Sequence, residues 1–154
     1  MQRGIVLARE MKMDGVVLGI LREDHSVDVE RTKELASLAR PMEVTFHRAF
    51  DECPDIMRAL ENVIQTGADR ILTSGGKPDV VTGAESLREL LAAAGKRIVI
   101  IPGGGITLEN FGLVRQATGA REFHSGLGKV LEYGSKDTRR FEEQVRKLAN
   151  LRAN

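Results

Sequence analysis

The sequence predicts an α/β fold of the (β/α)8 TIM-barrel type, truncated to about five parallel β-α units. Short apolar segments rich in Val and Ile begin about every 24 to 28 residues, which is the length of one strand and one crossover helix. Near-continuous apolar segments of this kind suit strands that are buried on both faces of a parallel sheet. We expect strands over residues 15–21, 43–47, 70–73, 97–101 and 121–124.

Amphipathic segments with recognisable ends lie between these strands. Asp55 and Thr107 are residue types whose side chains accept hydrogen bonds from the free N–H groups at a helix start. Gly67, Gly95 and Gly119 each follow an apolar stripe and are typical of helix ends. We expect helices over residues 28–39, 55–67, 87–95, 107–119 and 137–151.

A repeated pattern supports successive β-α units within a single partial barrel domain, residues 1–154. Three times a glycine that ends a helix precedes an Arg that opens a strand, at Arg70, Arg97 and Arg121. A complete barrel needs about 250 residues, and an open parallel sheet exposes an edge strand. The chain is therefore a truncated barrel, a sheet completed by another subunit, or a small open doubly wound sheet.

The composition excludes several classes of function. Hydrophobic residues make up 42% and charged residues 29%, as in a folded globular protein. The net charge of +1 gives no broad attraction for nucleic acid or anionic lipid, and no segment approaches the roughly 20 apolar residues of a membrane helix. Cys53 is the only cysteine, so no disulfide forms within the chain. We expect a cytoplasmic protein that binds neither nucleic acid nor membrane.

Polar residues and glycines gather where the expected strands end, which is where parallel α/β folds bind ligands. Strand alternation directs His47 toward the barrel axis, together with Glu122 and His124 from the last strand. Two imidazoles and a carboxylate on one interior favour acid/base chemistry or a metal site. The alternative is a hydrogen-bonded polar core that only holds the loops in place.

Two glycine-rich loops predict an anion site. Glycines let the backbone approach an anion closely, and the N-terminus of the helix after Thr107 offers free N–H donors. The glycines alternatively serve only the positive φ of a tight turn. Arg48 either binds the anion or forms an ion pair with Asp51. The predicted anion-binding residues are Ser74, Gly75, Gly76, Gly103, Gly104, Gly105 and Ser125.

Cys53 is the one candidate for a soft metal ligand. A cysteine thiolate binds cuprous ion well, although a lone cysteine near a helix start is more often an ordinary buried residue. The methionines at positions 11, 13, 42 and 57 form no close Met-x-x-Met pair, so they are interpreted as core residues.

Four motifs together resemble the CutC copper homeostasis family: Val-Thr-Phe-His-Arg-Ala-Phe-Asp at 44–51, Arg-Ile-Leu-Thr-Ser-Gly-Gly at 70–76, Ile-Pro-Gly-Gly-Gly-Ile at 101–106 and Glu-Phe-His at 122–124. The resemblance implies a (β/α)8 barrel, a cytosolic location, homo-oligomers and a role in copper binding or tolerance. The five strands match the last five of the family barrel, and residues 1–10 match the end of the preceding helix. The three strands that carry the family's N-terminal cysteines have no counterpart here.

Three functional hypotheses follow. In the first, the chain is a copper homeostasis protein with its ligand site around His47, Arg48, the glycine loops and His124. In the second, it is a barrel enzyme of the lyase, isomerase or hydrolase type that acts on a small phosphorylated or carboxylated metabolite. His47 or Glu122 would then be the acid/base, with Arg48, Asp51 and His124 as further catalytic candidates. In the third, it is a truncated chain that is stable only through self-association.

Overall fold

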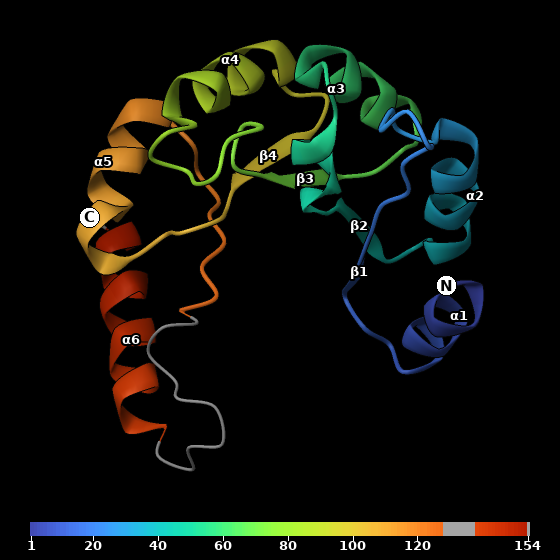
Figure 1. Ribbon diagram of the computed structural model, residues 1–154. Coiled ribbons are helices and arrows are strands. Elements are labelled where there is room, and N and C mark those ends of the chain that lie inside the picture. Colours follow the sequence, from blue (N-terminus) through green and yellow to red (C-terminus); the bar gives the residue numbers. More distant parts are fainter. Residues whose placement is uncertain (128–137, 154) are drawn as a thin grey trace.

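The computed structural model describes residues 1–127 and 138–153. Its centre is a four-stranded parallel sheet in the order β1-β2-β3-β4, with a helix between successive strands (Figure 1). This alternation confirms the predicted α/β fold of a truncated barrel. The strands are β1 (Gly15–Leu18), β2 (Glu43–Phe46), β3 (Arg70–Thr73) and β4 (Val99–Pro102). The helices are α1 (Gln2–Glu10), α2 (Val29–Ala39), η1 (Arg48–Glu52), α3 (Ile56–Gln65), α4 (Ala84–Ala94), α5 (Leu108–Thr118) and α6 (Arg139–Ala153).

The helices cover one face of the sheet, and the strand side chains alternate accordingly. Val44, Phe46 and Ile71 are fully buried against the helices. One row of side chains on the opposite face runs across the sheet through Val17, Thr45, Arg70 and Val99, as the strand register shows. In Figure 1 the chain forms an arch with helices on the outside and α1 and α6 at its two ends. The inner face of this arch is therefore the side that a complete barrel would bury.

The helix ends form as predicted. The Asp55 carboxylate accepts the backbone N–H groups of Met57 and Arg58 at 3.1 and 2.9 Å, and it caps α3. The Thr107 side chain and Asn110 form a reciprocal capping box at the start of α5. These local signals place the beginnings of α3 and α5 next to the ends of the preceding strands.

The predicted fifth strand, residues 121–124, is reduced to a single parallel bridge between Gly103 and His124. The His124 N–H donates to the carbonyl of Pro102 at 2.9 Å. No further strand flanks this segment within the described residues, and an edge segment receives ladder bonds from one side only. The other differences are smaller: β1 ends at Leu18 and β4 begins at Val99. The predicted start of the last helix, Asp137, lies outside the described residues.

The 3-10 helix η1, which follows β2 directly, was not predicted. None of the described helices is both long and apolar enough to cross a membrane.

Candidate functional site

Asp51 is the centre of a hydrogen-bonded network at the C-terminal ends of β2 and β3. Its Oδ1 atom accepts the backbone N–H groups of Ser74 and Gly76 at 3.0 and 2.9 Å, and it accepts the hydroxyl of Thr73. Its Oδ2 atom accepts Arg48 Nε at 2.8 Å and the Ser74 hydroxyl at 3.0 Å. The Asp51 side chain is only 9% exposed, and a buried carboxylate is costly unless it is hydrogen-bonded. The network gives both oxygens of the Asp51 carboxylate hydrogen-bond donors, and it connects η1 to the loop after β3.

Some N–H donors of the Arg48 guanidinium are hydrogen-bonded within the described part of the chain, and others are not. Besides the bond to Asp51, one terminal nitrogen donates to Ser74 Oγ at 2.8 Å. Nη1 donates to none of the described residues, and the side chain remains 42% exposed. A Cβ atom at Gly104 would lie 2.8 Å from Nη1, so only glycine lets the guanidinium lie against this loop. The predicted ion pair with Asp51 therefore forms, and free donors remain on the same group.

The loop between β4 and α5 adds backbone donors beside this guanidinium. Gly104 and Gly105 have φ angles of +109° and +86°, which side chains disfavour. Their N–H groups donate to no acceptor among residues 1–127 and 138–153. The carbonyl of Gly104 accepts the N–H of Val80 at 3.0 Å, which holds the loop in place. The N-terminus of α5, which carries the positive end of the helix dipole, comes directly after this loop.

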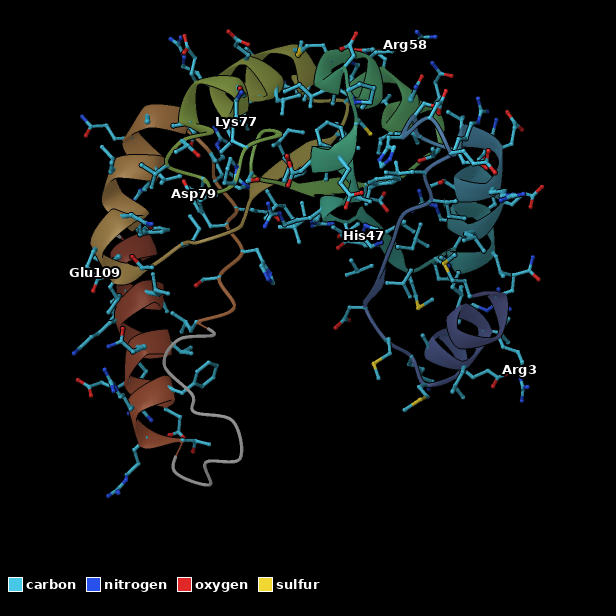
Figure 2. The ribbon with its side chains drawn as sticks, in the orientation of Figure 1. Arg3, His47, Arg58, Lys77, Asp79 and Glu109 are labelled. Atoms are coloured by element: carbon cyan, nitrogen blue, oxygen red, sulfur yellow. The ribbon has the colours of Figure 1, made fainter. Side chains whose placement is uncertain are left out.

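His47 lies directly after β2 (Figure 2). Its Nδ1 atom accepts the N–H of Ala49 at 3.2 Å, so the imidazole caps η1. A neutral ring that accepts at Nδ1 carries its proton on Nε2. A Cβ atom at Gly19 would lie 3.0 Å from the ring, which shows that the ring packs against the end of β1. Nε2 bonds to none of the described residues, and His47 thus has one free ring nitrogen.

The structure does not bring Glu122 to His47. Glu122 accepts Arg70 Nε at 3.1 Å, and Arg70 also pairs with Glu43 at 2.5 Å. Arg70 and Glu43 are the first residues of β3 and β2, so these ion pairs lie where the strands begin. The hydrogen bond that Arg70 donates to Glu43 holds the pKa of Arg70 above its usual value, and the Glu122 carboxylate adds to this effect.

His124 lies at the same end of the sheet as His47, but β3 and β4 separate the two residues. Its side chain is exposed, beside Gly103. The next residue, Ser125, donates its hydroxyl to the carbonyl of Ile106 at 2.8 Å and ties this segment to the glycine loop. The two histidines therefore flank the Arg48 region without contacting each other.

Cys53 is buried, with 7% of its surface exposed. Burial, together with the negative charges of Asp51 and Glu52, raises the pKa of its thiol to about 11. The thiolate is the form that binds metals, and at neutral pH Cys53 is a thiol. The described residues contain no group of three or more His, Cys, Asp or Glu side chains placed to hold a metal ion.

Two residues that organise the site were not among the predicted site residues. Thr73 donates its hydroxyl to Asp51, and its Oγ1 accepts the N–H of Gly75 at 2.8 Å. Val80 is fully buried and anchors the loop between β3 and α4, in which Figure 2 labels Lys77 and Asp79. A hydrophobic residue inside an otherwise polar loop is the one signal that pointed to Val80.

The fold and the site define part of a parallel (β/α) barrel with hydrogen-bond donors gathered at the strand C-terminal ends. The chain belongs to the CutC family, whose sequence profile matches residues 1–129. A CutC family protein of Parabacteroides distasonis is 44% identical over 127 residues, which cover 82% of this chain and 52% of the relative. The mouse protein named copper homeostasis protein cutC homolog is 41% identical over 136 residues, covering 88% of this chain and 50% of the relative.

Solved structures agree with this assignment. A crystal structure under the name copper homeostasis protein CutC, from Streptococcus agalactiae, is 31% identical with a TM-score of 0.75. The match covers 80% of this chain and 60% of that one. A structure named native KDPGal has a TM-score of 0.69 at 16% identity, covering 97% of this chain and 63% of that one, and it shows a shared fold alone. The chain spans about half the length of the curated relatives it matches.

Proposed function

We propose that the chain is a cytoplasmic copper homeostasis protein whose ligand site is the anion pocket. This name denotes the Arg48 guanidinium together with the N–H groups of Gly104 and Gly105. The family supports the role in copper homeostasis, because relatives from mouse and human carry that name. The position of the pocket supports a ligand site, because parallel barrels bind their ligands at the C-terminal ends of the strands.

The ligand supported best is a small phosphorylated or carboxylated metabolite. The observation that carries this proposal is the set of unpaired donors: Arg48 Nη1 and the two glycine N–H groups have no acceptor among the described residues. Guanidinium groups and exposed backbone N–H groups are the partners that phosphate and carboxylate oxygens prefer. An anion between them would satisfy donors from both η1 and the loop after β4.

The described residues do not fit a copper ion held directly at this site. Cuprous ion prefers thiolate and thioether ligands, whereas Cys53 is a buried thiol. His47 follows β2 and His124 bridges to Gly103 after β4, so β3 and β4 lie between the two imidazoles. We therefore propose that the part of the chain described here contributes an anion site, and that the copper role does not depend on Cys53 as a ligand.

Calorimetric titration with inorganic phosphate tests the pocket. Arg48→Gln removes the guanidinium, and we expect it to weaken phosphate binding at least about tenfold, the effect of losing one charge-assisted hydrogen bond. Arg58→Gln removes an exposed arginine of α3 (Figure 2) and should leave the affinity unchanged. Equal phosphate affinity in the wild type and Arg48→Gln would refute the anion pocket.

Native mass spectrometry of the chain from copper-supplemented cells tests the copper role and the expected homo-oligomer together. We expect no copper held through Cys53, so that Cys53→Ser carries the same metal load as the wild type. Copper that is bound by the wild type and lost in Cys53→Ser would contradict this proposal.

One observation favours an enzymatic alternative. His47 is held by its Nδ1 bond to Ala49 while Nε2 is unpaired among the described residues, which suits proton transfer to a ligand. Nuclear magnetic resonance can follow the conversion of a pool of small sugar phosphates and carboxylic acids. Turnover that is lost in a folded His47→Ala variant would support an enzyme, and turnover that His47→Ala retains would exclude His47 as its acid/base.

A further inference from the structure

Asp51, in η1, is the acceptor for donors from three parts of the chain. Its two oxygens accept from Arg48 Nε, the Thr73 and Ser74 hydroxyls, and the N–H groups of Ser74 and Gly76. These donors come from η1, from the last residue of β3 and from the loop after β3. None of them belongs to the loop between β4 and α5, so Asp51 reaches the anion pocket only through Arg48.

We infer that Asp51 is the positioning residue of the anion pocket, and that it fixes the Arg48 guanidinium so that Nη1 faces Gly104. The sequence alone grouped Asp51 with the catalytic candidates. In the structure its oxygens are fully used within the protein and its side chain is only 9% exposed. A carboxylate in this state does not contact a ligand anion, which it would repel.

The geometry explains how the positioning works. The Nε bond at 2.8 Å sets the direction of the guanidinium plane, and the bond to Ser74 Oγ at 2.8 Å sets its rotation. Ser74 is itself held by Asp51, and its hydroxyl also bonds to the carbonyl of Lys77. Asp51 therefore sets the first constraint on Arg48 directly and contributes to the second. An arginine fixed in this way loses less conformational entropy when it binds an anion than a free arginine does. The inference rests on the proposed anion pocket for its ligand, whereas the order of Arg48 can be measured without a ligand.

Two measurements on Asp51→Asn test the inference separately from the proposed function. An Asn amide presents N–H donors where Arg48 and Ser74 already donate, so the network opens. Solvent exchange of the Arg48 Nε–H, measured by nuclear magnetic resonance without ligand, should rise at least tenfold in Asp51→Asn. The control Asp55→Asn changes a helix cap that does not touch Arg48 and should leave this exchange unchanged. An unchanged Arg48 signal in Asp51→Asn would overturn the positioning role, even if phosphate binds.

A double-mutant cycle with inorganic phosphate provides the second measurement. We expect Asp51→Asn to weaken phosphate binding about tenfold in the wild-type background and to have no further effect in Arg48→Gln. Additive losses would overturn the inference, because a merely structural role would act in both backgrounds. Absence of phosphate binding to the wild type would instead overturn the proposed function and leave the exchange measurement to decide on Asp51. If Asp51→Asn does not fold, Thr73→Val removes one bond to Asp51 and should produce a smaller change of the same sign.

Discussion

Gly104 is restricted to glycine by two separate constraints. Its φ of +109° lies in a region that side chains rarely adopt, and a Cβ atom would stand 2.8 Å from Arg48 Nη1. Gly119, at the end of α5, has a φ of +70° but nothing within 4 Å of the same position. Substitutions at Gly104 and Gly119 can therefore be compared to separate the effect of backbone strain from the effect of contact with the Arg48 guanidinium.

We predict that Gly104→Ala lowers both the stability and the phosphate affinity, while Gly119→Ala lowers the stability alone. Backbone strain of this kind costs about 1–3 kcal/mol, and the methyl group at Gly104 additionally displaces Arg48. Urea unfolding and phosphate titration of both variants measure the two effects. If Gly104→Ala bound phosphate as tightly as Gly119→Ala does, the Arg48 contact would not matter for the pocket.

Cys53 gives a prediction of pH dependence. Its thiol pKa is raised to about 11 by burial, so in the unfolded chain the thiol ionises at a lower pH than in the folded protein. The unfolded state then binds fewer protons, and the contribution of Cys53 to stability falls as the pH rises above about 9.

Urea unfolding at pH 8 and pH 10 tests whether the contribution of Cys53 to stability falls as the pH rises. The stability difference between the wild type and Cys53→Ala should be smaller at pH 10 than at pH 8. Alkylation by iodoacetamide should be slow in the folded protein at pH 8 and fast in urea. Rapid alkylation of the folded protein would show an exposed thiolate and reopen the question of a metal ligand.

At the scale of single residues, part of the candidate site could be predicted from the sequence and part could not. Arg48 and Asp51 are three residues apart in one short motif, and their ion pair follows from local chain geometry. The partner of Glu122 is Arg70, 52 positions earlier in the chain. That contact depends on how the segment after α5 lies against β3, which the pattern of apolar residues does not determine. His47 could be placed at the end of β2, but its role as a cap depends on η1, which has no sequence signature here.

At the scale of elements, the helix ends were the most predictable features because their signals are local. Asp55 and Thr107 cap helices in the structure as their residue types indicate. The strand positions were predictable from the apolar segments, whereas their lengths were not. Segment 121–124 has the composition of a strand, but ladder bonds depend on neighbours that are distant in sequence.

The capping box of α5 is expected to contribute to the stability of the folded chain. Thr107→Ala removes the side chain that accepts the N–H of Asn110, and we expect a loss of about 1 kcal/mol in unfolding free energy. Thr107→Ser retains the hydroxyl and should retain the stability. Urea unfolding distinguishes these outcomes, and equal stability of the Ala and Ser variants would show that the cap is not needed.

At the scale of the whole molecule, the helices shield only one side of the sheet. On the inner face Val17 is 64% exposed and Val99 is 38% exposed. Parallel sheets are usually buried on both faces, so this exposed inner face is a candidate surface for the expected self-association.

We predict that the 154-residue chain self-associates through this inner face. Val17→Lys places a charge at the β1 end of this row and should shift the chain toward the monomer, because a buried charge without a partner opposes association. Val81→Lys is the matched control, since Val81 is 42% exposed but lies in the loop before α4, away from this row. Sedimentation velocity at several protein concentrations measures the change. An equal distribution of species in the two variants would show that association, if present, uses another surface, and a monomeric wild type would contradict the prediction outright.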